Sequence, residues 1–286
     1  MRPNLAMLTA TSEIPRLPSF VYGTAWKEGE TQRLTELALQ QGFRGIDTAN
    51  QRRHYYEEAV GNGIAVAIKS GLVVRDELFL QTKFTFRRGQ DHRLPYDPEA
   101  GIPVQVEQSF ASSLQHLSVE QIDSYLLHGP TQRTGLAPAD WATWRAMEAI
   151  LESGRARMLG VSNVTAEQLR TLCQDARVQP RFVQNRCYAD QGWDRAVREF
   201  CHTSGITYQG FSLLTTNRAT MAHPDLARIA KRHDRTPSQI VFRFAIHIGI
   251  LPLTGTTSAT HMREDLTVLD FQLDEGEVRC IESISG

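Results

Sequence analysis

The sequence predicts an α/β protein that folds as a (β/α)8 TIM barrel, in a single domain over residues 1–286. The length of 286 residues is close to the usual size of such a barrel. Short apolar runs alternate with longer helical patterns without a break in composition, and this alternation predicts a parallel sheet with right-handed crossovers. An open, doubly wound sheet fits the alternation equally well, and the length favours the barrel.

Eight short apolar runs are the expected strands. In chain order they occupy residues 20–24, 44–47, 78–82, 122–127, 156–161, 181–184, 207–211 and 249–253. Helical patterns fall between and after them, over residues 30–41, 56–70, 104–117, 141–153, 166–175, 195–203, 224–233, 236–245, 261–269 and 274–284. In the third pattern Val106, Phe110, Leu114 and Leu117 recur at the period of a half-buried helix. Thr236 and Pro237 fit the N-cap and first position of their helix.

Composition narrows the classes of protein and partner. Hydrophobic residues make up 41% and charged residues 22%, which are ordinary globular values. A net charge of −1 gives no indication of binding to nucleic acid or to an anionic membrane. No apolar run reaches the ~18 residues needed to span a membrane. The N-terminus lacks the apolar core of a signal peptide, so we expect a cytoplasmic protein. Four cysteines without CxxC spacing indicate reduced thiols rather than a metal site.

Polar residues close three of the expected strands. Asp47, Lys83 and His128 each end an apolar run, and Tyr55 and Tyr56 follow Asp47 in the next loop. The carboxyl ends of parallel strands share one face of a barrel, where barrel enzymes build their sites, so these side chains should converge. The long connection over residues 85–103, rich in Pro, Gly and charge, leaves the same face and is expected to be functional.

These residue types suit carbonyl reduction. A Tyr donates a proton to a developing alkoxide, a neighbouring Lys lowers the pKa of the phenol, a carboxylate pairs with the Lys, and a neutral His orients the carbonyl oxygen. Each residue also has an ordinary explanation: Asp47 as a helix cap, Lys83 at the barrel rim, His128 in a loop, and the two tyrosines in packing. Three such residues at strand ends, with a Tyr in the next loop, favour a shared site, but by themselves they do not name a reaction.

Several segments together resemble the aldo-keto reductase family, in that family's order. They are YGTAW from Tyr22, GFRGIDTAN from Gly42, HYYEEAVG from His54, QTK from Gln81, SYLLHGP from Ser124, GRARMLGVSN from Gly154, VQN from Val183 and LPLTGTT from Leu251. The resemblance implies a catalytic tetrad of Asp47, Tyr55, Lys83 and His128. The loop before Gly61 is about two residues longer than the common pattern, which leaves Tyr56 as an alternative to Tyr55.

The resemblance also implies a nicotinamide cofactor, NADPH, with NADH possible because the customary Lys of the 2′-phosphate site is missing. The implied cofactor-binding residues are Gly23, Thr24, Ser162, Asn163, Gln184, Phe211, Ser212, Leu214, Thr254, Gly255, Thr256, Thr257, His261 and Asp265. The expected substrate pocket contains Trp26, Tyr56, Phe84 and Tyr188. The alternative role of Phe211, Trp26 and Phe84 is packing within the barrel. The alternative for the threonine-rich segment 254–257 is an ordinary turn without a cofactor.

The sequence therefore predicts an NAD(P)H-dependent reductase of small-molecule aldehydes or ketones, as a monomer or weak homodimer. Reduction of C=N or activated C=C bonds fits the same residues. A nicotinamide-binding regulatory barrel and an aldolase with Lys83 as Schiff-base lysine are the alternatives from other classes. Members of the resembled family that have a long C-terminal tail close the substrate site with it. The given sequence ends directly after its last helical pattern, so the resemblance implies an open pocket and broad specificity.

Overall fold

Eight parallel strands form one closed barrel in the computed structural model, which describes residues 17–284. The strands follow one another round the barrel in chain order, and β1 pairs with β8 to close it, with Val21 opposite Leu253. The expected (β/α)8 barrel is confirmed, and the eight strands lie within two or three residues of their predicted positions. Their bounds are β1 (Val21–Gly23), β2 (Gly45–Asp47), β3 (Phe79–Phe84), β4 (Ile122–Leu127), β5 (Ala156–Ser162), β6 (Phe182–Arg186), β7 (Thr207–Phe211) and β8 (Ile250–Thr254). The domain prediction also covers residues 1–16 and 285–286, which lie outside the described residues.

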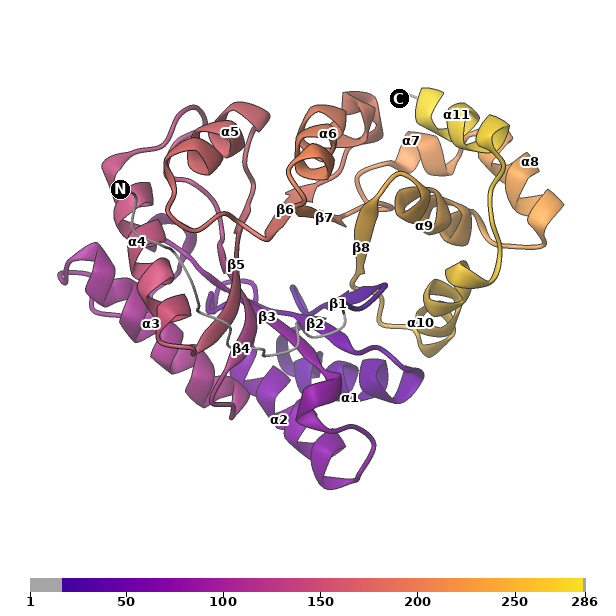
Figure 1. Ribbon diagram of the computed structural model, residues 1–286. Coiled ribbons are helices and arrows are strands. Elements are labelled where there is room, and N and C mark those ends of the chain that lie inside the picture. Colours follow the sequence, from indigo (N-terminus) through magenta and orange to yellow (C-terminus); the bar gives the residue numbers. More distant parts are fainter. Residues whose placement is uncertain (1–16, 285–286) are drawn as a thin grey trace, which may run out of the picture.

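The helices surround the strands as an outer ring (Figure 1). Those expected from the sequence are α1 (Thr31–Gln41), α2 (Glu57–Lys69), α3 (Ile102–Leu117), α4 (Pro138–Glu152), α5 (Ala166–Asp175), α6 (Arg195–Thr203), α8 (Pro224–His233), α9 (Pro237–His247), α10 (Ala259–Leu266) and α11 (Glu275–Ser283). Helix α4 begins earlier than predicted because Pro138 takes its first position, which proline tolerates. The one-turn α7 (Arg218–Met221) was not predicted, since four residues are too few to show a period.

Each strand presents alternate residues to the barrel interior and to the helices. On β3, Gln81 and Lys83 face inward, whereas Thr82 and Phe84 face the helix layer. The interior is apolar at one end, where Phe79 packs against Phe182 at a ring distance of 5.5 Å. Polar side chains follow toward the carboxyl ends of the strands. The barrel thus has a closed apolar end and a polar end at which chemistry is possible.

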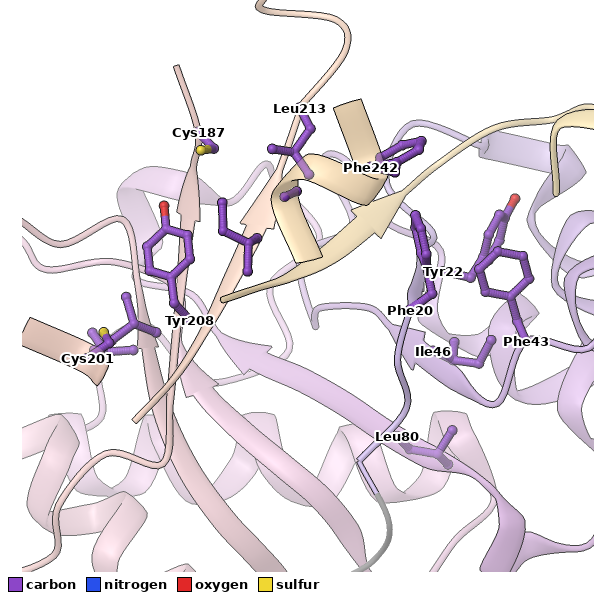
Figure 2. Packing of buried hydrophobic residues seen from close by; sticks show 14 of the residues in the cluster. Phe20, Tyr22, Phe43, Ile46, Leu80, Cys187, Cys201, Tyr208, Leu213 and Phe242 are labelled. Carbon is purple, nitrogen blue, oxygen red and sulfur yellow. The ribbon is translucent and has the colours of Figure 1, made fainter. Parts of the chain in front are cut away.

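The main hydrophobic core lies between the strands and the helix ring. Phe20 packs edge-on against Phe43 and against Phe242 of α9, with ring centroids 5.9 and 4.9 Å apart. Figure 2 shows Phe242 extending from its helix toward Phe20 beside the strands. This packing joins α9 to the start of β1, next to the point where the barrel closes.

The long connection after β3 is anchored to the barrel face. The buried Tyr96 hydroxyl donates to the carbonyl of Thr85 at 2.9 Å, and Gln90 Nε2 donates to the carbonyl of Asn50 at 2.8 Å. All four cysteines are free thiols. Within residues 17–284, no helix combines the length and the hydropathy needed to cross a bilayer.

Candidate active site

A cavity of about 1240 Å³ opens at the carboxyl ends of the strands. Every strand, or the loop directly after it, contributes to its wall: Gly23, Asp47, Thr85, His128, Ser162, Gln184, Phe211 and Thr254. Three non-glycine residues of the wall, Trp26, Asn163 and Ser212, have φ between 55° and 62°, in the left-handed region. Such backbone conformations are costly and gather at functional sites.

A buried ion pair lies at the floor of the cavity. Lys83 is fully buried, and its ammonium donates to both carboxylate oxygens of Asp47 at 2.7 Å and to the carbonyl of Thr48 at 2.8 Å. Burial lowers the pKa of Lys83, and the negative charge of Asp47 opposes this effect. The three ammonium protons are all used, so Lys83 is held rigidly and presents its positive charge through space.

Side-chain amides support the carboxylate from below. Gln81 and Gln184 each donate Nε2 to Asp47 Oδ1, at 2.7 and 2.9 Å. Gln209 accepts from both of these amides, and Ser124 donates to Gln81 Oε1 at 2.9 Å. Buried charges are tolerated when their remaining hydrogen-bonding capacity is satisfied, and this network meets that condition for Asp47.

Tyr55 lies above the ion pair. The Lys83 ammonium is 5.3 Å from the centroid of the Tyr55 ring, and the Tyr55 and His128 rings are 6.0 Å apart at 70°. Burial and the charge of Asp47 raise the pKa of Tyr55 above 10.0, and Arg186 acts in the opposite sense. The predicted lowering of the Tyr55 pKa is therefore not seen, because burial of the phenol outweighs the positive charge near it.

His128 is held as a neutral imidazole. Burial, and then the positive charge of Lys83, lower its pKa to about 3. The Thr85 hydroxyl lies 2.6 Å from Nδ1, so a proton donated by Thr85 leaves Nε2 as the protonated nitrogen. Because His128 lines the cavity, its Nε2–H can donate to an oxygen inside it.

Six of the residues expected in the site lie outside the cavity wall, and strand geometry accounts for several of them. Thr24 is buried and donates to the Asp47 carbonyl, and Phe84 packs on Phe86 and Tyr96 in the helix layer. The guanidinium of Arg52 stacks 4.0 Å over the Tyr56 ring. Thus Tyr55, and not Tyr56, faces the cavity. The six residues are Thr24, Tyr56, Lys83, Phe84, Tyr188 and Thr257.

The remaining expected residues do line the cavity. Besides Asp47, Tyr55 and His128, they are Gly23, Trp26, Ser162, Asn163, Gln184, Phe211, Ser212, Leu214, Thr254, Gly255, Thr256, His261 and Asp265. Trp26 is 67% exposed and packs on the His54 ring at 4.0 Å, so it forms part of the rim.

Part of this wall has open hydrogen-bond acceptors. Asn163 Nδ2 donates to the His128 carbonyl at 2.8 Å and Gln184 Nε2 to Asp47, while Asn163 Oδ1 and Gln184 Oε1 accept no bond from the described residues. Two acceptors in the wall of one cavity suit the NH2 group of a carboxamide. Near β8, a Cβ on Gly255 would lie 3.4 Å from the Gly23 carbonyl, so glycine keeps this part of the wall open.

The comparisons with known proteins identify the family of this chain. The model of the "Aldo/keto reductase family" matches residues 21–285. The chain belongs to this family. The family resemblance seen in the sequence is thereby confirmed, as is the barrel.

Relatives of this aldo-keto reductase family member are similar over most of their length. Prostaglandin-E(2) 9-reductase of Oryctolagus cuniculus and 9,11-endoperoxide prostaglandin H2 reductase of Trypanosoma cruzi are each 28% identical, with 94% of this chain and 88% of each relative covered. The solved structure of the Bombyx mori aldo-keto reductase AKR2E4 in complex with NADP is 27% identical, with a TM-score of 0.79, covering 93% of this chain and 88% of that chain. An aldo/keto reductase from Brucella melitensis is 26% identical, also at 0.79, with 93% of both chains covered.

Sequence reasoning missed several polar residues of the wall in this family member. Arg186 has a detectable signal, because it stands two residues after Gln184 on β6 and therefore points the same way. Lys27, whose ammonium donates to the Gly255 carbonyl, has none, because the two residues are 228 positions apart. Arg88 lies in the connection over residues 85–103 that was expected at this face. Other polar residues missed are Gln51, His54, Gln132, Arg133, Thr165, Gln168, Thr215, Thr236, Ser238 and Glu264.

Proposed function

We propose that this protein is an NADPH-dependent carbonyl reductase in which Tyr55 donates the proton to the carbonyl oxygen of an aldehyde or ketone. The observation that carries the proposal is the position of Tyr55. It is the tyrosine that lines the cavity, beside His128 and above the Lys83–Asp47 pair. Family membership supports carbonyl reduction in general.

The residues divide the proton chemistry among them. The neutral His128 donates Nε2–H to the carbonyl oxygen and sets its position above the Tyr55 hydroxyl. As negative charge develops on that oxygen, Tyr55 transfers its proton. The phenolate that results is stabilised by Lys83 and by Arg186, whose charge already acts on this phenol. Asp47 keeps the ammonium charged and in place.

The cofactor wall fits a nicotinamide dinucleotide. Reduced nicotinamide supplies hydride to the carbonyl carbon when it is bound. Asn163 Oδ1 and Gln184 Oε1, with Ser162, would hold the carboxamide, and Phe211 would stack on the ring. Ser212, Leu214, Thr254, Gly255 and Thr256 would surround the phosphates, with Lys27 supplying positive charge. His261 and Asp265 would contact the adenosine end.

NADPH is favoured over NADH by the relatives, since the Bombyx mori relative has NADP bound. Lys27 and His261 line this part of the cavity, and the carboxylates of Glu264 and Asp265 stand nearby and offset their positive charge. We therefore expect NADPH to be used with a modest preference, and NADH to support slower turnover.

The Schiff-base alternative has little support from the geometry. Lys83 does not line the cavity, and all three protons of its ammonium are bound to Asp47 and Thr48. An amine that forms an imine needs a free lone pair and access to the substrate carbonyl.

The test compares Tyr55→Phe with Tyr56→Phe. NADPH oxidation is followed at saturating cofactor against aldehydes, ketones and cyclic imines, and NADPH affinity by fluorescence. Loss of the proton donor is expected to reduce kcat roughly 100- to 10,000-fold while cofactor affinity stays within about threefold. Tyr56→Phe is expected to remain active, because its ring stacks on Arg52 outside the cavity. Wild-type turnover by Tyr55→Phe refutes the proposed role, and NADPH binding without turnover on any acceptor favours the regulatory alternative.

A further inference from the structure

One charged side chain of the cavity, Arg186, has only a supporting part in the proposed chemistry. Arg186 is the last residue of β6, on the inward face that also carries Phe182 and Gln184. It is exposed and lines the same cavity as Tyr55. Its guanidinium carbon lies 5.2 Å from the centroid of the Phe211 ring, so the planar group rests on an aromatic face.

Apart from the contact with Phe211, Arg186 has no partner among the described residues. It takes part in none of the ion pairs or side-chain hydrogen bonds formed within residues 17–284, whereas other charged residues of the cavity wall do. Arg88 donates to the Pro130 carbonyl at 2.6 Å, and Lys27 donates to Gly255. The carboxylate of Asp47 is already occupied by Lys83 and two amides.

The positive charge of Arg186 acts on Tyr55, the proposed proton donor, which lines the same cavity. It lowers the pKa of Tyr55 against the larger effects of burial and Asp47. A substrate whose carbonyl oxygen meets Tyr55 therefore has its substituents within the field of Arg186. Five N–H donors in a planar fork match a carboxylate in two parallel hydrogen bonds.

We propose that Arg186 determines substrate specificity by binding the carboxylate of a keto acid, whose carbonyl lies one or two carbons away. This inference rests on the proposed function, since it assigns the substrate class of the same site. The reaction balances as keto acid plus reduced nicotinamide plus one proton, giving hydroxy acid plus oxidised nicotinamide. Hydride adds to the carbonyl carbon, the π pair of C=O becomes the bond to the proton from Tyr55, and the carboxylate keeps its charge.

The partly open cavity limits the size of the effect. A hydrogen-bonded charge pair in a partly desolvated site contributes more than a surface pair, while water at the mouth screens it. Loss of the guanidinium is thus expected to lower the preference for a carboxylate substrate by roughly tenfold to a hundredfold.

The test uses matched substrates and matched variants. The kcat/KM values for phenylglyoxylate and its methyl ester are measured at saturating NADPH for wild type, Arg186→Gln and Arg186→Lys. Arg145→Gln, on the exposed face of α4 and in no ion pair within the described residues, makes the same charge change away from the cavity. Thermal unfolding and NADPH affinity are measured for each variant.

The ratio of the two kcat/KM values is the decisive quantity. Wild type and Arg145→Gln should prefer the carboxylate, Arg186→Gln should lose that preference through a higher KM, and Arg186→Lys should retain part of it. An unchanged ratio in Arg186→Gln, or a loss confined to NADPH affinity, overturns the inference while the proposed function stands. Absence of turnover by wild type on both substrates also overturns the inference, and it refutes the proposed function only if the aldehydes and ketones of the first screen give no turnover either.

Discussion

Replacing Asp47 by Asn should be among the most destabilising substitutions in this protein. Asp47 is 3% exposed and receives two ammonium hydrogen bonds from Lys83 and one each from Gln81 and Gln184. The amide retains one oxygen for the two glutamines but places an NH2 group against the ammonium. Lys83 is then a buried charge without a counter-charge, and removing one partner of such a pair costs about 3–5 kcal/mol.

The partner substitution separates this cost from simple loss of packing. Lys83→Met removes the charge and keeps the length of the side chain, so the double variant Asp47→Asn/Lys83→Met contains no uncompensated charge. We expect the double variant to be more stable than Asp47→Asn alone, by about 2 kcal/mol or more. Glu275→Gln breaks an exposed ion pair with Arg279 and serves as the control, with no measurable loss expected.

Urea denaturation at pH 7, followed by tryptophan fluorescence and by far-UV circular dichroism, gives the free energy of unfolding of each variant. If the losses of the two single variants simply add in the double variant, the pair is not coupled and the reasoning is refuted. A loss below about 1 kcal/mol for Asp47→Asn would likewise show that Lys83 is hydrated or neutral in the folded protein.

Three further predictions concern titration and tautomer. The pKa of His128 is lowered to about 3 and that of Tyr55 is raised, so neither group titrates near neutral pH. The kcat/KM for reduction should therefore be constant from about pH 5 to 9. An inflection near pH 6.5 that His128→Gln removes would contradict this prediction. The pKa of Asp265 is raised to about 6 by burial, so its neutral form stabilises the fold below about pH 4 and this contribution is lost as the pH rises through 6. Asp265→Asn should then raise the free energy of unfolding by about 1–3 kcal/mol at pH 8 and leave it unchanged at pH 4, measured by urea denaturation, and an equal change at both values would exclude titration as the cause. Thr85→Val removes the hydroxyl 2.6 Å from His128 Nδ1, so kcat/KM should fall about tenfold while NADPH affinity stays unchanged. Thr85→Ser retains the hydroxyl and should keep kcat/KM near the wild-type value. An equal loss in Thr85→Ser would assign the effect to packing.

Much of the fold and part of the site follow from local patterns. Strand and helix positions depend on apolar periodicity, which neighbouring residues in the chain specify, so eight strands and ten helices were predicted close to their observed bounds. Asp47 and His128 lie in the cavity wall for the same reason, because each closes a strand of a parallel barrel.

Strand alternation also specifies that Phe84, directly after Lys83, points to the helix layer and that Arg186, two residues after Gln184, points into the cavity. Tertiary structure decided what these side chains contact. The choice of Tyr55 over Tyr56 depends on Arg52 stacking on Tyr56. The sequence likewise does not predict that the Lys83 ammonium donates all three of its hydrogen bonds to Asp47 and Thr48. Hydrogen-bond partners and desolvation depend on groups that only the closed barrel brings within 3 Å of one another.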